Sequence, residues 1–153
     1  MAEPSLTEFA DRLNSVLPAV IKGFSQRQAV ELYKGKITLP QFLVLDFLSQ
    51  KNDSRMTDMA NFMKVTTAAM TGIVGRLVKY GYVSRAFDAD DRRIIKVRLT
   101  DKGSDLLRRI NRQRRRMIID IFSQISEKER QDYLGILMHI HQILAQAEKS
   151  AKG

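Results

Sequence analysis

Apolar residues recur at helical spacing over most of the chain, which predicts a mostly α-helical protein. At the N-terminus, Ser5 and Glu8 form a capping-box pattern ahead of an apolar stripe, and Pro18 should kink or restart that helix. A second helical piece is expected from about Ala19 to Leu32, ending near Gly35. The first part of the chain is therefore expected to be helical throughout.

Three further helix starts follow. A second capping box, Thr38-x-x-Gln41, opens the next helix. Thr57 can cap a short helix that runs to Met63. Thr66 can cap another helix that ends at about Tyr80, and the Gly81 that follows is suited to the left-handed residue just past a helix.

The pattern then changes from helical spacing to near-alternation. Residues 82–87 and 94–99 are rich in β-branched and aromatic side chains, and the turn-forming residues between them predict a hairpin. Thr100 can cap a long helix after this hairpin. A third box, Ser126-x-x-Glu129, starts the last helix.

From Arg55 to Thr100 the order of elements is strand, helix, turn, helix and hairpin, which can place one helix in a DNA major groove with the hairpin beside it. We expect residues 38–100 to form this winged helix-turn-helix unit. Residues 1–37 and 101–153 are expected to form a helical dimerisation region, because their helices are too apolar on one side for the central unit to cover. Intramolecular three-helix packing is the alternative.

Charge is distributed unevenly along the chain. Residues 51–116 hold 17 Lys/Arg against 7 Asp, whereas residues 1–50 hold 5 basic against 5 acidic and residues 117–153 hold 4 against 5. A positive excess confined to one region is the electrostatic footprint of a protein that binds a polyanion. A basic surface that only confers solubility is the alternative.

Several function classes are disfavoured by composition. The chain has no cysteine, which excludes disulfides and thiolate metal sites. His139 and His141 are two apart and point in opposite directions on a helix, so no metal site is expected. No apolar run reaches the roughly 18 residues of a membrane span, and the N-terminus has the pattern of a helix, not of a signal peptide. We therefore expect a cytoplasmic protein without a cofactor.

The helix after Thr66 has two different sides. Its apolar side consists of Met70, Ile73, Val74 and Leu77. The opposite side is small and partly basic, with Ala68, Thr71, Gly72, Gly75, Arg76 and Lys79. Two interior glycines cost roughly 1 kcal/mol each relative to alanine, so a face that enters a groove explains them better than a solvated face; tight helix–helix packing is the alternative. The candidates for DNA contact are Thr66, Thr67, Ala68, Thr71, Gly72 and Arg76.

The tip of the hairpin combines acidic and basic residues in the sequence Asp88-Ala89-Asp90-Asp91-Arg92-Arg93. One carboxylate can orient one guanidinium there, while the turn itself needs an Asx interaction. An arginine held in this way can enter a narrow, electronegative minor groove. An exposed turn with weak surface salt bridges is the alternative.

Together these motifs resemble the multiple-antibiotic-resistance regulator (MarR) family of winged-helix repressors, from about Phe9 to Ala145. The matching pieces are Thr38-Leu39-Pro40-Gln41-Phe42, Met56-Thr57-x-Met59-Ala60, Val65-Thr66, Gly81-Tyr82-Val83-x-Arg85, Asp88-x-x-Asp91-x-Arg93 and Val97-x-Leu99-Thr100-x-x-Gly103. The resemblance implies a homodimer that represses transcription from a pseudo-palindromic double-stranded DNA operator. It also implies a small aromatic or anionic effector.

By this resemblance Asp91 and Arg93 are the paired residues of the wing, with Arg93 reaching the minor groove. Arg92 stands at a variable position and is expected to touch phosphate. Gly75 and Arg76 stand where the family often has an acidic residue and an arginine, so the resemblance does not predict the base preference.

Six arginines crowd residues 108–116, either as a solvated face or as an extension of the DNA surface. Arg114 falls on the apolar stripe, a heptad from Leu107 and Ile121, so we expect a carboxylate partner for it from another helix or subunit. Two other functions stay open at this point. One is a winged-helix protein–protein interaction module without specific DNA binding. The other is an enzyme that holds an anionic substrate, against which stands the lack of an acid–base pair.

Overall fold

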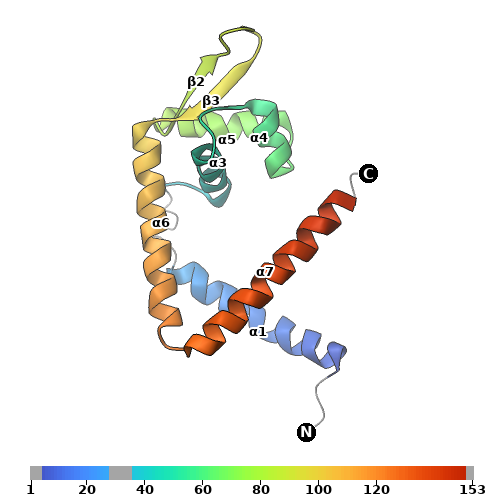
Figure 1. Ribbon diagram of the computed structural model, residues 1–153. Helices are drawn as coiled ribbons and strands as arrows, with labels where there is room; N and C mark the ends of the chain where they lie inside the picture. The colour runs from blue at the N-terminus through green and yellow to red at the C-terminus, as the bar shows by residue number, and fades with distance from the viewer. Residues whose placement is uncertain (1–4, 28–35, 151–153) are drawn as a thin grey trace. The chain divides into compact units, whose positions relative to one another are not determined.

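The computed structural model of the protein describes residues 5–27 and 36–150, and it is mostly α-helical with one small sheet (Figure 1). In chain order the elements are α1 (Leu6–Arg27), α3 (Leu39–Ser49), β1 (Ser54–Arg55), α4 (Met56–Met63), α5 (Thr67–Lys79), β2 (Val83–Phe87), β3 (Ile95–Leu99), α6 (Asp101–Phe122) and α7 (Glu127–Ser150). The chain divides into two compact units, residues 1–114 and 115–153, and the boundary falls within α6.

The three strands form an antiparallel sheet in the order β1–β3–β2. Ser54 of β1 lies opposite Val97 of β3, and Val83 of β2 lies opposite Leu99. The β2–β3 hairpin, the wing, follows the end of α5 and projects away from α3 (Figure 1). Together, α4, α5 and this wing are the winged helix-turn-helix that the sequence predicts.

These elements pack around one hydrophobic core. It includes residues of α3, α4, α5, the wing and the first half of α6. Its most deeply buried large side chains are Ile37, Val44, Leu45, Leu48, Met59, Met70, Val74, Leu77, Val97, Leu106 and Ile110. Full burial of one such side chain stabilises the fold by about 1.5–3 kcal/mol. The helix that carries the candidate DNA contacts is thus fixed by the same core that anchors α6.

Capping bonds are present at four of the predicted helix starts, Ser5, Thr38, Thr66 and Ser126. Thr38 Oγ1 accepts from the backbone N–H of Gln41 at 3.4 Å, while Gln41 Oε1 accepts from the backbone N–H of Thr38 at 2.8 Å. The same reciprocal pattern precedes α1 at Ser5 and α7 at Ser126. Thr66 caps α5 by accepting from the N–H three residues further on, at 3.1 Å. These bonds satisfy N–H groups that have no partner inside the helix.

The start of α4 differs from the prediction. The helix begins at Met56, and its N-cap, Arg55, makes no side-chain capping bond, so the expected cap by Thr57 is wrong. The reason is that β1 ends directly at the helix, which places Thr57 inside the first turn. The predicted end at Met63 is confirmed, and Lys64 after it has a left-handed φ of 52°.

At Pro18 a kink of the first helix stays a prediction, but a restart there is wrong. α1 is continuous from Leu6 to Arg27, so it does not end and restart at Pro18. An interior proline removes one backbone hydrogen bond and costs about 3 kcal/mol or more, but the remaining bonds can still carry the helix past it. The last part of the piece predicted to reach Leu32, with its end near Gly35, lies outside the described residues.

A carboxylate from another subunit stays a prediction for Arg114, which is half-buried and contacts an aromatic ring within its own protomer. Its guanidinium carbon lies 5.3 Å from the centre of the Phe42 ring, a cation–π arrangement. No carboxylate lies within ion-pair distance of it among the residues that the structure describes. Because Arg114 is partly exposed, water stabilises part of its charge. The face of the Phe42 ring stabilises the charge further.

Two helices bear large apolar side chains that are exposed in the described protomer. Neither α1 nor α7 has a buried residue. The exposed set on α1 is Leu6, Phe9, Leu13, Val16, Leu17, Val20 and Ile21. The set on α7 is Tyr133, Leu134, Ile136, Leu137, Met138, Ile140, Ile143 and Leu144. A second protomer as the cover for these helices stays a prediction.

The start of α6 lies against the base of the wing. A Cβ atom built on Gly103 would lie 2.0 Å from the carbonyl oxygen of Tyr82. Thr100 N donates to this same oxygen at 3.1 Å, and Thr100 Oγ1 donates to the carbonyl of Gly81 at 2.6 Å. Gly103 N in turn donates to Thr100 Oγ1 at 3.1 Å, so the predicted cap is confirmed. We call Gly81, Tyr82, Thr100 and Gly103 the wing junction.

We expect Gly103→Ala to lower the free energy of unfolding by at least about 3 kcal/mol, because a methyl group has no space beside the Tyr82 backbone. Gly72→Ala is the matched control. Its Cβ would meet no atom within 4 Å, so it should raise stability by about 0.5–1 kcal/mol. Urea denaturation measures both, and a Gly103→Ala protein as stable as the wild type would contradict the close contact.

Candidate nucleic-acid interface

The predicted division of α5 into two sides is present. Met70, Val74 and Leu77 are fully buried in the core, and Ile73 is partly buried against it. The predicted contact residues Thr66, Thr67, Ala68, Thr71, Gly72 and Arg76 are all exposed. The turn before α5 is fixed by the left-handed Lys64 and by Val65 N, which donates to the carbonyl of Ala60 at 3.0 Å. The core therefore holds α5 with its small-residue side toward solvent.

The two threonine hydroxyls on this side differ in hydrogen-bonding capacity. Thr66 Oγ1 accepts from the backbone N–H of Ala69, so its own proton stays available for donation. Thr71 Oγ1 donates to the carbonyl of Thr67 at 2.8 Å, so it keeps only acceptor capacity. At an interface, Thr66 can donate to a phosphate or base acceptor, whereas Thr71 can accept from a base amino group.

The two glycines of α5 have different surroundings. A Cβ on Gly72 would meet nothing within 4 Å, while one on Gly75 would meet Nη2 of Arg85 at 3.7 Å. Neither position thus faces another helix within the described protomer, which argues against tight helix–helix packing as the reason for them. Gly72 leaves the exposed side of α5 shallow, and Gly75 leaves room for an arginine from β2.

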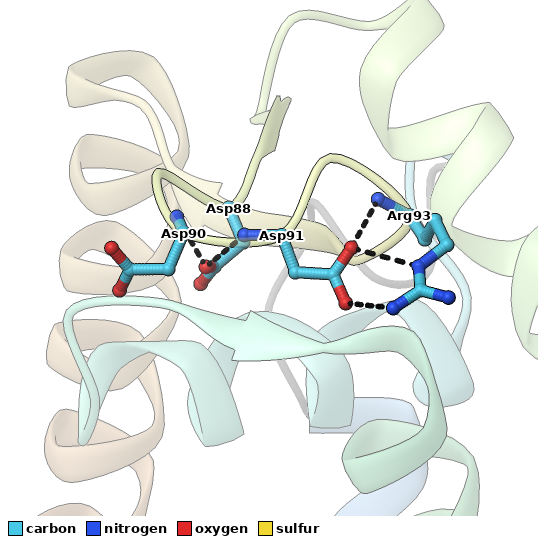
Figure 2. A network of polar contacts seen from close by, with 4 residues as sticks. All are labelled: Asp88, Asp90, Asp91 and Arg93. Atoms are coloured by element: carbon cyan, nitrogen blue, oxygen red, sulfur yellow. Dashed lines mark hydrogen bonds and ion pairs between the residues drawn. The ribbon is translucent and has the colours of Figure 1, made fainter.

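The tip of the wing is organised by Asp88. Its Oδ1 accepts from the backbone N–H groups of Asp90 at 2.9 Å and Asp91 at 3.2 Å, the expected Asx interaction (Figure 2). Its other oxygen lies 2.8 Å from Nζ of Lys96. The bond from Lys96, followed by the two backbone bonds, lowers the pKa of Asp88 to about 2. The carboxylate of Asp88 therefore serves the turn.

Asp91 and Arg93 form the predicted pair. Nε and Nη2 of Arg93 donate to the two carboxylate oxygens of Asp91, both at 3.1 Å, and Arg93 N donates to Oδ1 at 3.0 Å (Figure 2). This contact lowers the pKa of Asp91 and raises the pKa of Arg93. Asp91 therefore orients the guanidinium of Arg93. Because the Arg93 side chain is 91% exposed, it stays accessible to a ligand. Arg92, beside it, is exposed as well.

A groove of about 500 Å³ joins α5 to the wing. Its lining includes Thr67 and Thr71 from α5, Arg93 from the wing tip, Arg55 from β1 and Arg85 from β2. None of the nine lining residues is acidic. The groove brings predicted residues of the helix and the wing to one site, with three guanidinium groups.

Arg55 and Arg85 were not predicted from the sequence as site residues. Alternation along β2 was an available signal, because it places Arg85 on the same face of the strand as the buried Val83. Arg55 gave no comparable signal, since β1 is only two residues long.

The arginines of α6 differ in their surroundings. Arg108 forms an ion pair with Asp105, which neutralises part of its charge. Arg112, Arg115 and Arg116 are exposed. An extension of the DNA surface onto these arginines stays a prediction.

The described residues contain no group of three or more His, Cys, Asp or Glu side chains that could hold a metal ion. Within the same residues, no helix is long and apolar enough to cross a membrane.

Comparison with known proteins gives a consistent picture. The sequence profile of the MarR family matches residues 37–95. The uncharacterized HTH-type transcriptional regulator YsmB of Bacillus subtilis is 26% identical over 131 residues, which are 84% of this chain and 88% of YsmB. The HTH-type transcriptional repressor MdtR of the same organism is 26% identical over 92% of this chain and 91% of MdtR. A MarR family protein from Bacillus stearothermophilus has the same fold, with a TM-score of 0.78 at 24% identity over 94% of this chain and 99% of that one.

We expect Lys96→Met to raise the pKa of Asp88 from about 2 toward its ordinary value of 3.8, because the bond from Lys96 is the largest cause of the shift. A lowered folded-state pKa stabilises the fold above the unfolded-state pKa, and this contribution disappears as the pH falls from about 4 to 2. Titration of the side-chain carboxyl by NMR measures the change. Arg92→Met, which removes the same charge from the wing tip, is the control, and an unchanged Asp88 pKa in Lys96→Met would contradict the assignment.

Proposed function

This chain belongs to the MarR family of winged helix-turn-helix transcription regulators, and we propose that it is a DNA-binding repressor that a small molecule releases from its operator. The observation that carries the proposal is the groove, which brings the exposed threonines of α5 and the oriented Arg93 of the wing to one cationic site. The charge excess of residues 51–116 supports the same function, because DNA is a polyanion.

In the proposed complex α5 is the recognition helix and enters the major groove. Thr66, Thr67, Ala68 and Thr71 contact the bases, because the N-terminal residues of a recognition helix lie deepest in the groove. Gly72 allows this close approach, since no side chain stands between the helix and the bases. Arg76 near the other end of the helix is solvent-exposed and contacts the backbone.

The wing contributes contacts beside the recognition helix. Arg93, aimed by Asp91, enters the minor groove next to the major groove that α5 occupies. Arg92 is exposed beside it and contacts phosphate. Phosphate contacts set position and affinity, whereas base and groove-width contacts give sequence preference.

We further propose that residues 1–37 and 101–153 form the dimerisation region. The exposed apolar side chains of α1 and α7 support this, because a surface of this kind on a stable protein is normally covered. A homodimer with a twofold axis would place its two recognition helices on half-sites of a pseudo-palindrome, about 34–36 Å apart.

The release of the repressor depends on an effector, for which we propose a small aromatic or anionic molecule. The similarity to MdtR, a repressor, supports repression as the direction of control. We place the protein in the cytoplasm because the DNA that it binds is there.

We expect Arg93→Ala to weaken binding to an operator, selected from random DNA, by about 1–3 kcal/mol, because it removes the oriented guanidinium. Arg92→Ala is the matched control from the same tip and should have a smaller effect, with no change in sequence preference. Fluorescence anisotropy across a salt series measures both affinity and its salt dependence.

Two outcomes would count against this proposal. Unchanged operator affinity in Arg93→Ala would remove the role of the wing. A flat dependence of log K on log salt, together with no enriched sequence in the selection, would favour the protein–protein interaction module instead.

We expect Ile140→Glu on α7 to shift the protein toward monomers and to reduce operator affinity, because a carboxylate would be buried in the proposed interface. Gln142→Glu on the same helix adds the same charge outside the apolar set and should leave the dimer intact. Analytical ultracentrifugation gives the mass of each variant. A monomeric wild-type protein at micromolar concentration would contradict the dimer.

A further inference from the structure

Arg85 connects the wing to the recognition helix. It lies in the middle of β2, and its Nη2 donates to the backbone carbonyl of Thr71 in α5 at 3.5 Å. The same nitrogen lies 3.7 Å from the position that a Cβ on Gly75 would take. The guanidinium is therefore placed against one turn of α5, between Thr71 and Gly75.

Most of the hydrogen-bonding capacity of Arg85 is unused in this position. A guanidinium has five N–H donors, and the contact with Thr71 engages one of them. Among the described residues no carboxylate forms an ion pair with Arg85. The residue is exposed, so its remaining donors and its full charge are available to a ligand.

The ligand that fits this place is an anion. Arg85 lines the groove with Arg55 and Arg93, and Thr67 and Thr71 are the polar residues of α5 in the lining. Asp91 pairs with Arg93, but no ion pair compensates Arg55 or Arg85 among the described residues, so the groove keeps a positive excess that a bound anion relieves. An arginine fork matches the oxygens of a phosphate better than any other cationic side chain.

The geometry of double-stranded DNA identifies that anion. One sugar-phosphate backbone separates a major groove from the adjacent minor groove. A protein that places α5 in the major groove and Arg93 in the minor groove must span this backbone. The phosphates then cross between α5 and the wing, where the groove containing Arg85 lies.

We propose that Arg85 is a further DNA-contacting residue, which binds a backbone phosphate in the groove between α5 and the wing. This inference rests on the proposed function and adds a contact that neither the recognition helix nor the wing tip supplies. Gly75 contributes to this proposed phosphate site. Because it has no side chain, nothing at that position covers or neutralises the guanidinium 3.7 Å away.

The first test compares Arg85→Met with Arg98→Met. Arg98 belongs to the same hairpin but alternates onto the other face of the sheet, where it lies 3.8 Å from Asp53. Arg85→Met should weaken operator binding about tenfold or more and reduce the salt slope by about one per protomer. Arg98→Met loses the same charge and should change the affinity less than twofold. Chemical denaturation checks that both variants keep wild-type stability.

The second test distinguishes a direct contact from an effect on folding. Single phosphates of the operator are replaced, one at a time, by neutral methylphosphonates. Wild-type protein should lose affinity at one particular position in each half-site, and Arg85→Met should be insensitive to substitution at that same position. A purely structural role for Arg85 would leave the variant as sensitive as the wild type at every position.

The third test uses the glycine. Gly75→Asp would place a carboxylate beside the guanidinium and should weaken binding at least as much as Arg85→Met. Gly75→Ala is its control, because a methyl group at 3.7 Å from Nη2 is in ordinary contact, and it should bind within about twofold of wild type.

The inference is overturned if Arg85→Met binds the operator like the wild type, or if no methylphosphonate position loses its effect in that variant. It is also overturned if inorganic phosphate at constant ionic strength binds the wild type through Arg85 but leaves the affinity for DNA unchanged. That result would make the groove a site for a free anion. Failure of the proposed function is distinguishable, because wild-type protein itself would then bind no DNA with a salt-dependent affinity.

Discussion

The position of the wing relative to α5 depends on the wing junction. Gly81, just after α5, has a left-handed φ of 75°, and its carbonyl accepts from the hydroxyl of Thr100. The next carbonyl, that of Tyr82, accepts from Thr100 N and lies so close to Gly103 that a Cβ there could not be accommodated. The end of α5, both strands of the wing and the start of α6 therefore meet within a few residues. A shift at this point would separate Arg93 from the threonines of α5, and the groove between them would lose its shape.

Two acidic residues of the wing fix the positions of basic side chains on a surface that is otherwise positive. Asp88 closes the turn and holds Lys96, while Asp91 holds Arg93 through two side-chain bonds. Such charge-assisted bonds are shorter and stronger than neutral ones, although exposure to solvent weakens their net effect. The wing tip thus contains acidic residues and still exposes Arg92 and Arg93, because the carboxylates of Asp88 and Asp91 are engaged within the wing.

The sequence predicted those parts of the fold that depend on neighbouring residues. Helix caps at Thr38 and Thr66 and the Asx turn at the tip of the hairpin are set by bonds over two or three residues, so local patterns sufficed. The prediction failed where another element decides. Thr57 is not the N-cap, because β1 runs directly into α4. The contact of Arg114 with the ring of Phe42 was also not predicted, since it joins α6 to α3.

The candidate site was predictable to the same extent. The exposed side of α5 followed from helical spacing, and the pairing of Asp91 with Arg93 followed from their separation by one residue. The groove did not, because it joins residues from β1, α5, β2 and the wing tip that only the tertiary fold brings together. Arg85 is the clearest example, since its contact with Thr71 spans 14 residues.

The pair of side-chain bonds between Asp91 and Arg93 also has an entropic consequence. An arginine side chain loses roughly 1.5–2 kcal/mol of rotamer freedom when it is fixed. The two bonds from Asp91 restrict Arg93 before any ligand arrives, so part of this loss occurs at folding and not at association. An exposed arginine without such bonds would lose its freedom only in the complex. A wing built in this way associates as a partly ordered element, which favours fast formation of a complex from productive first encounters.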